Sequence, residues 1–82
     1  MTRKRYIKLL MASGFSRNSA AQAARYARDQ LCGWGFYRRD AESWMTVWRA
    51  MARHSASPSV KAESCRRAAI LQQALRKGAA HE

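Results

Sequence analysis

Acidic residues are scarce in this chain of 82 residues, which has 5 Asp and Glu against 16 Lys and Arg and a formal net charge of +11. So large an imbalance opposes folding by self-repulsion and attracts polyanions. We therefore expect the partner to be RNA, DNA, a ribonucleoprotein or an acidic protein surface.

The few acids also include no compact pair suited to general acid and base work or to two-metal chemistry. The two histidines, His54 and His81, have no partner set resembling a nucleophile, a base and an orienting residue. We expect no enzyme, no catalytic residue and no cofactor. Asp40 is better explained as a helix N-cap, and Glu63 as a local partner of nearby basic residues.

Cysteine is also rare: Cys32 and Cys65 are far apart and lack the close ligand pairs of a zinc site. We expect two reduced, partly buried thiols in a cytoplasmic protein, and no bound metal. Long apolar runs are missing as well, and the apolar stretch near the N-terminus is interrupted by Lys8. The sequence therefore predicts neither a secretory signal nor a transmembrane segment.

What the chain does have is enough apolar material to fold. Hydrophobic residues make up 48% of it, and there are three Trp. This exceeds what a disordered polycation carries. The length allows one domain with one modest core, so we expect a single helical domain spanning residues 1–82.

Two helices are predicted in the first part of the chain, over residues 2–13 and 16–31. Gly14 ends the first helix, and Ser16 can cap the second. Small residues form a narrow stripe along the second helix, at Ala20, Ala23, Ala24, Ala27 and Leu31. Such a stripe lets a neighbouring helix approach closely.

Two further helices are predicted over residues 40–54 and 58–77, the first starting at Asp40 as its N-cap. An apolar stripe at i, i+3, i+4 and i+7 predicts its core face: Trp44, Val47, Trp48 and Met51. The last helix begins at Pro58 after the cap Ser57, buries a face that includes Val60, Ala68, Leu71 and Leu75, and stops at Gly78. With no alternating strand pattern, the expected fold is an all-α, compact single-domain bundle of about four helices with a frayed C-terminal tail.

The segment CGWGFYRRD, residues 32–40, is either a plug for the core or a platform on which a nucleic-acid base stacks. A small domain needs large aromatic residues to fill its core, so we expect Trp34 and Phe36 to point inward. Tyr37, beside Arg38 and Arg39, is expected to face outward and contact the partner.

Basic residues fall into three groups on the outer faces of the predicted helices. Any one group is compatible with an ordinary solvated face, but the total charge favours binding. The groups are Arg3, Lys4, Arg5 and Lys8; Arg17, Arg25 and Arg28; and Arg38, Arg39, Arg49 and Arg53. All of these except Arg3, together with Tyr37, are the candidate nucleic-acid or partner-binding residues.

The first two helices also suggest a helix-turn-helix, because a helix ending at Gly14 is followed at once by a capped, arginine-bearing helix. In this interpretation the residues able to read bases are Arg17, Asn18, Gln22 and Arg25. An ordinary helical hairpin explains the same pattern. The stretch LLMASGFSRNSAAQAA also resembles the opening of ubiquitin-associated domains, but the rest of that domain's pattern is missing.

The opening RKRYIKLLMASGFSRNSAAQAARYAR resembles the N-termini of small proteins encoded by phages and prophages of intestinal bacteria. The resemblance covers about the first third of the chain. Small phage proteins of this kind include anti-CRISPR inhibitors, many of which occupy a nucleic-acid or partner-binding surface of a Cas effector. The resemblance implies a cytoplasmic location in a bacterial host and carries over no functional residue.

The leading hypothesis is therefore a small basic phage-type protein that binds a nucleic acid or nucleoprotein stoichiometrically, as an anti-CRISPR inhibitor does. One alternative is a DNA-binding regulator of helix-turn-helix type, which prefers one duplex sequence and binds as a dimer. Another is a structural or scaffold protein that uses its apolar helix faces for protein–protein interaction.

Overall fold

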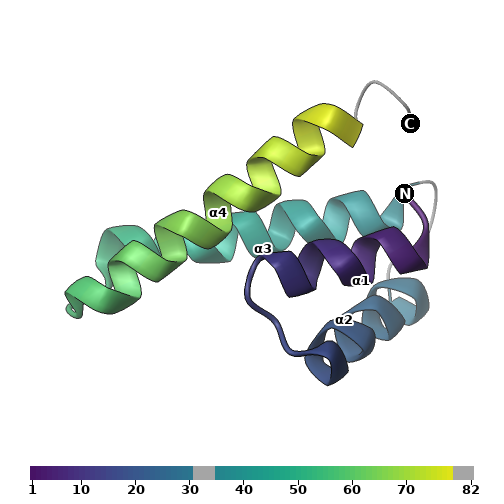
Figure 1. Ribbon diagram of the computed structural model, residues 1–82, viewed down its shortest axis with the longest axis horizontal. Helices are drawn as coiled ribbons and strands as arrows, with labels where there is room; N and C mark the ends of the chain where they lie inside the picture. The colour runs from purple at the N-terminus through teal and green to yellow at the C-terminus, as the bar shows by residue number, and fades with distance from the viewer. Residues whose placement is uncertain (31–34, 79–82) are drawn as a thin grey trace.

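A computed structural model describes residues 1–30 and 35–78, and these ranges contain four helices and no strand. They are α1 (Arg3–Ala12), α2 (Arg17–Gln30), α3 (Phe36–His54) and α4 (Pro58–Gly78) (Figure 1). The radius of gyration of 12.6 Å is close to the value of about 12 Å expected for a compact chain of this length. The prediction of an all-α bundle of about four helices is confirmed.

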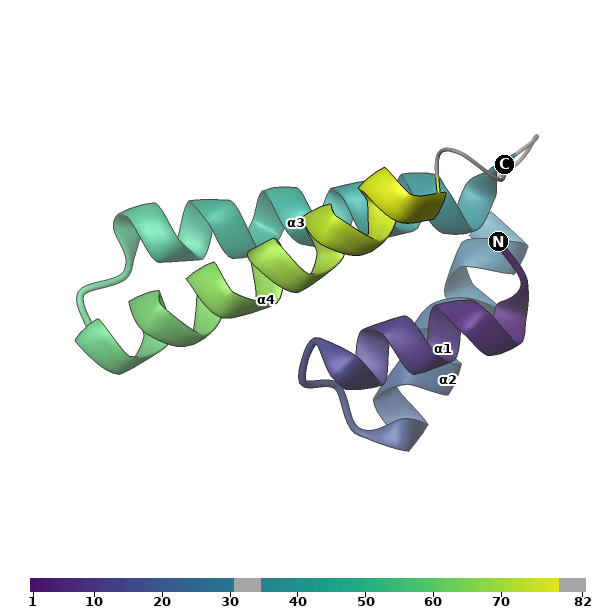
Figure 2. The same cartoon turned by 45° about the horizontal axis from the view of Figure 1, so that its top comes forward.

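The two longest helices, α3 and α4, form an antiparallel hairpin, and α1 and α2 pack against one end of it (Figure 2). The core lies where the four helices meet, between α1, α2, the first half of α3 and the second half of α4. It consists of Tyr6, Leu10, Ala20, Ala24, Ala27, Tyr37, Ala41, Leu71 and Leu75. The other end of the hairpin, near the loop at residues 55–57, lies away from α1 and α2.

Small side chains and hydroxyl caps explain how α1 and α2 pair. Ala20, Ala24 and Ala27 are fully buried, as the stripe of alanines predicts, so α2 can lie close to its neighbours. The Thr2 hydroxyl accepts a hydrogen bond from the Arg5 amide at 3.2 Å. The Ser16 hydroxyl accepts one from the Ser19 amide at 3.2 Å. Both bonds satisfy amides that a helix N-terminus leaves without a partner, which confirms Ser16 as a cap.

The third helix begins earlier than the sequence predicts, and Asp40 is not its N-cap. Gly35 occupies the capping position with φ 76°, and Asp40 lies inside α3 with 8% of its surface exposed. Its carboxylate accepts a hydrogen bond from the buried Tyr6 hydroxyl of α1. An aspartate is usual at a helix start, but here a partner from another helix explains its position, and sequence alone does not show that partner.

The earlier start changes which face of α3 is buried. The residues that pack on α1, α2 and α4 are Tyr37, Ala41, Trp44 and Trp48, spaced i, i+4, i+7 and i+11. Val47 and Met51 stay 44% and 39% exposed, so the prediction that they belong to the core face is wrong. The predicted apolar stripe started at residue 40 and left out Tyr37 and Ala41. It therefore included residues on the solvent side of the helix.

The aromatic segment is also placed differently. Tyr37 is 8% exposed and its ring lies 5.1 Å from that of Tyr6, so the prediction that Tyr37 faces outward is wrong. Phe36 is partly buried and packs against the core, as predicted. Because Tyr37 is the second residue of α3, its side chain follows the buried stripe of that helix. The predictions for Leu31, Cys32, Trp34 and the C-terminal tail lie outside the described residues.

The last helix agrees with the sequence at both ends and along the second half of its buried face, whereas Val60 is only half-buried. It begins at Pro58, and the Ser57 hydroxyl accepts a hydrogen bond from the Val60 amide at 3.5 Å. Ala68, Leu71 and Leu75 are buried as predicted. Proline suits the first helical position because its missing N–H would have no helical partner there.

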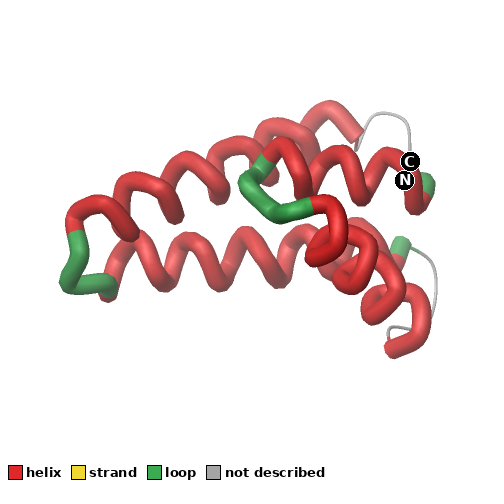
Figure 3. The backbone as a smooth tube through the Cα atoms, turned by 60° about the horizontal axis from the view of Figure 1, so that its bottom comes forward, coloured by secondary structure: helices red, strands yellow, loops and turns green. Residues whose placement is uncertain are grey.

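The turn between α1 and α2 lies over the middle of the hairpin (Figure 3) and is held against α4 at a glycine. Gly14 has φ 119°, and a methyl group added to it would lie 2.8 Å from Nε of Arg67. Gly35 also has a positive φ, of 76°, but an added methyl group there would meet nothing within 4 Å. Both positions strain a side chain, yet only Gly14 brings the turn directly against an α4 side chain.

We expect Gly14→Ala to lower the free energy of unfolding by about 2 kcal/mol or more, because it combines backbone strain with displacement of Arg67. Gly35→Ala is the matched control, with strain alone and a smaller loss. Urea unfolding of both variants measures the difference. Equal losses would show that contact with Arg67 adds nothing at Gly14.

Candidate nucleic-acid interface

The first basic group lies on the outer face of α1. Lys4, Arg5 and Lys8 are all exposed, and at about 100° per residue they share the side opposite the buried Tyr6 and Leu10. Arg3 is also exposed, but it lies on another side of the helix. The structure thus brings three of these four predicted residues onto one face.

The second basic group lies along α2, beside its buried alanines. Arg17, Arg25 and Arg28 are exposed and fall within an arc of about 80°. Arg28 forms an ion pair with Asp29 at 3.1 Å. Arg17 and Arg25 form no ion pair with any carboxylate that the structure describes. This face agrees with the prediction that the three arginines project together.

The third basic group is a stripe along α3. Arg38 and Arg53 are about 22 Å apart along the helix axis, so this group is extended and not a cluster. Arg38 forms an ion pair with Glu42 at 3.4 Å and donates a hydrogen bond to the Leu75 carbonyl at 3.5 Å. Arg49 donates to the Gln72 side chain of α4 at 3.0 Å. Arg39 is exposed on a neighbouring side of α3.

Every carboxylate in the described ranges already has a partner. Asp29 pairs with Arg28, Glu42 with Arg38, and Glu63 with Arg66 and Arg67. Asp40 accepts from Tyr6. The exposed bases on the candidate faces that form no ion pair with any described carboxylate include Lys4, Arg5, Lys8, Arg17, Arg25, Arg49 and Arg53. Their charge is left uncompensated at the surface.

One arginine that the sequence did not single out has a different role. Arg67 has a side chain only 23% exposed, and its guanidinium carbon lies 4.7 Å from the centre of the Trp48 ring. Its Nε donates to Glu63 at 3.1 Å, and Arg66 donates to the same carboxylate at 2.6 Å. The spacing of Glu63 and Arg67 at i, i+4 predicts their pairing, but nothing in the sequence shows the contact with Trp48.

These two arginines lower the pKa of Glu63 to about 2, chiefly through the hydrogen bonds from Arg66 and then from Arg67. A carboxyl whose pKa falls on folding stabilises the protein above its unfolded pKa and loses that contribution as pH falls toward its folded pKa. We expect stability to fall between about pH 4.5 and pH 2. Thermal melts of the parent and of Glu63→Gln should show a smaller acid loss in the variant; equal slopes would contradict the pairing.

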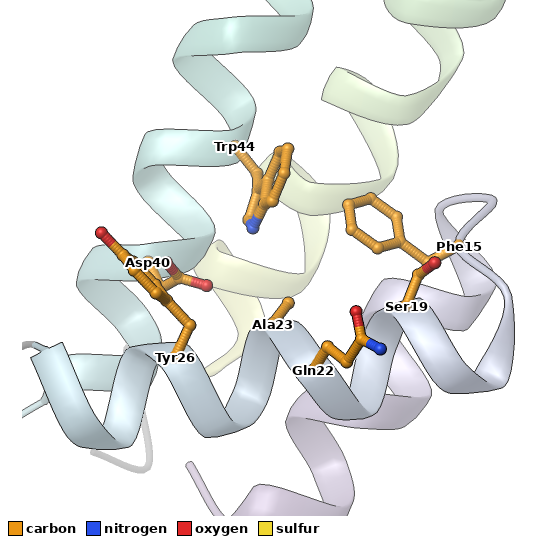
Figure 4. A pocket seen from close by; sticks show the side chains of 7 residues that line it. All are labelled: Phe15, Ser19, Gln22, Ala23, Tyr26, Asp40 and Trp44. Atoms are coloured by element: carbon orange, nitrogen blue, oxygen red, sulfur yellow. The ribbon is translucent and has the colours of Figure 1, made fainter.

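A hollow of about 420 Å³ lies between α2, α3 and the end of the α1–α2 turn (Figure 4). Phe15, Tyr26 and Trp44 give it aromatic walls, and Asp40 gives it one carboxylate. Ser19, Gln22 and Ala23 line the α2 side. Sequence reasoning missed this hollow, because it treated Asp40 as a cap and gave Tyr26 no role. The sequence signal that could have shown it is Tyr26, an aromatic residue in an otherwise alanine-rich and polar helix.

Other site types find little support in the part of the chain that the structure describes. No group of three or more His, Cys, Asp and Glu there could hold a metal ion. Cys65 is a free and exposed thiol, which corrects the expectation of partial burial: it lies on the outer flank of α4. Within the described residues, no helix has the length and apolar character needed to cross a membrane.

Comparison with protein family models, with curated proteins and with solved structures finds no match to this chain.

Proposed function

We propose that this protein binds nucleic acid stoichiometrically through the basic faces of α1, α2 and α3. The observation that carries this proposal is that every described carboxylate already has a partner, while most of the exposed bases on these faces form no ion pair with any of them. Phosphate groups neutralise such charge and release condensed counterions. Neutralisation by phosphates reduces the self-repulsion of a chain of 82 residues with a formal charge of +11 more than solvent alone does.

A narrower proposal is that the nucleic acid belongs to a ribonucleoprotein and that binding inhibits it, as anti-CRISPR proteins inhibit Cas effectors. Its support is the resemblance of the N-terminal third to small phage proteins and the small size of the chain. A guide RNA held on a protein presents phosphates in a fixed arrangement that a small basic protein can cover.

The test compares labelled mixed-sequence RNA and DNA with polyglutamate of similar charge, using fluorescence anisotropy at low salt. Nucleic acid should bind more tightly than polyglutamate, because its phosphates are held at regular, close spacing and their neutralisation releases condensed counterions. Equal affinity for polyglutamate would contradict a nucleic-acid function and indicate an acidic protein partner.

One observation favours the helix-turn-helix regulator as a second candidate. The residues of α2 able to read bases, which are Arg17, Asn18, Gln22 and Arg25, are all exposed. They lie within an arc of about 140° that borders the buried alanines at Arg17. A regulator should select one duplex sequence from a randomised pool and bind it as a dimer. Recovery of no common sequence from such a selection would remove this candidate.

A further inference from the structure

We propose that the hollow between α2 and α3 holds one unpaired base of a single-stranded nucleic acid, and that guanine is the base it fits. This inference rests on the proposed nucleic-acid function and adds to it a site and a base preference. The hollow combines aromatic walls with one carboxylate, and each of these matches a different feature of a base.

The walls supply surfaces on which a base can stack. The rings of Phe15 and Trp44 meet edge to face, with centres 4.9 Å apart at 83°. Tyr26 is 62% exposed, the largest exposure among the exposed large hydrophobic residues of the described chain. Its exposed ring beside the hollow offers a flat surface on which a base can stack.

The carboxylate of Asp40 supplies the preference for guanine. Asp40 is 8% exposed, and the Tyr6 hydroxyl donates its one proton to Oδ2. No other hydrogen bond to this carboxylate comes from the described residues, so acceptor capacity remains on the side that lines the hollow. The Watson–Crick edge of guanine has two adjacent donors, N1–H and N2–H. The other bases present one donor there, or donors flanked by acceptors, and so match a carboxylate less well.

One donor group is placed to meet the acceptor atom of the same base. Figure 4 shows the indole nitrogen of Trp44 turned toward the enclosed space, and Gln22 at the α2 wall. The indole N–H is a donor that can reach O6 of a guanine whose donor edge meets Asp40. A donor and an acceptor thus occur on the sides of the hollow that a guanine requires.

Charge favours a neutral base over a small cation in this hollow. Arg25 is exposed on α2, three residues after Gln22 and next to Tyr26. A free cation near Asp40 would meet the repulsion of a protein with a formal charge of +11. A nucleotide avoids that repulsion, because its base is uncharged and its phosphate is attracted by the positive charge of the protein, to which Arg25 contributes.

The test uses labelled oligonucleotides of about 12 nucleotides, made of thymine alone or with one guanine, adenine or cytosine at the centre. Binding is measured by fluorescence anisotropy at low salt, as DNA and as the uracil-based RNA. The guanine oligonucleotide should bind about tenfold more tightly than the thymine one. Tyr26→Ala should abolish most of that difference, and Val47→Ala, at an exposed α3 position outside the hollow, should keep it. Asp40→Asn, which retains an acceptor for Tyr6, should also reduce the preference.

Melting temperatures show that each variant is folded, and Tyr26→Ala tests the site even if Asp40→Asn is unstable. Equal affinity for all four oligonucleotides, or a guanine preference that survives Tyr26→Ala, overturns the base site and leaves the nucleic-acid function standing. Failure of every oligonucleotide to bind overturns both proposals.

Discussion

Tyr6→Ala should lower the free energy of unfolding by about 3–5 kcal/mol, the usual cost of deleting a large buried aromatic side chain. Tyr6 is fully buried, packs on the Tyr37 ring, and donates a hydrogen bond to Asp40. It therefore connects α1 to two positions of α3. The total stability of a domain of this size is about 4–12 kcal/mol, so this loss is a large share of it.

Tyr6→Phe separates the hydrogen bond from the packing. It keeps the ring and removes the only described donor to the buried Asp40 carboxylate, which should cost about 1.5–3 kcal/mol. Denaturant unfolding measures both variants, with Tyr26→Ala as the control for loss of an exposed tyrosine. If Tyr6→Ala were as stable as Tyr26→Ala, the core described above would be wrong.

The Tyr6 hydroxyl also gives the fold a pH dependence. Burial, and then the hydrogen bond to Asp40, raises the pKa of Tyr6 well above its ordinary value. A raised pKa on folding stabilises the protein below the unfolded value of about 10, and this contribution is lost as pH rises above it. The parent should therefore lose stability above about pH 10 more steeply than Tyr6→Phe does.

The second large effect concerns binding. The double reversal Arg17→Glu with Arg25→Glu should weaken oligonucleotide affinity about 10- to 100-fold at low salt, because two phosphate contacts become repulsions. Both side chains are exposed and form no ion pair with any carboxylate of the described chain, so folding should change little. Anisotropy titrations at low and high salt give the affinity and show whether the loss shrinks with screening.

A matched control changes the same number of charges elsewhere. Lys61 and Lys77 are exposed on α4 and belong to none of the three basic groups. Their reversal to glutamate alters the net charge equally and should weaken binding less. If both double variants lost the same affinity, net charge alone would explain binding and the α2 face would have no particular role.

Local sequence signals correctly predicted those helix ends that depend only on neighbouring residues. Ser16 and Pro58 are found at the helix starts where capping and proline chemistry place them. Asp40 misled because its local preference for a helix start is real, while its actual partner, Tyr6, is 34 residues away in sequence. Because the periodic pattern was counted from the wrong first residue, it assigned Val47 and Met51 to the buried face of α3.

The candidate site also has features that the sequence predicts and features that only the fold reveals. Arginine spacing within α2 predicted a shared face, because helix geometry alone fixes it. The hollow is formed by α2, α3 and the turn at Phe15, so it depends on tertiary packing that no single segment specifies. Arg67 likewise resembles any other surface base in sequence, and only the fold brings it over Trp48.

The most direct test of nucleic-acid binding is the affinity of the unmodified protein for a mixed-sequence oligonucleotide as a function of salt concentration. If the basic faces contact about four phosphates, the logarithm of the affinity should fall linearly with the logarithm of salt concentration. The loss should be at least about thirtyfold between about 50 and 200 mM. An affinity that does not change with salt, or the absence of binding at the lowest salt, would contradict a nucleic-acid partner held by these faces.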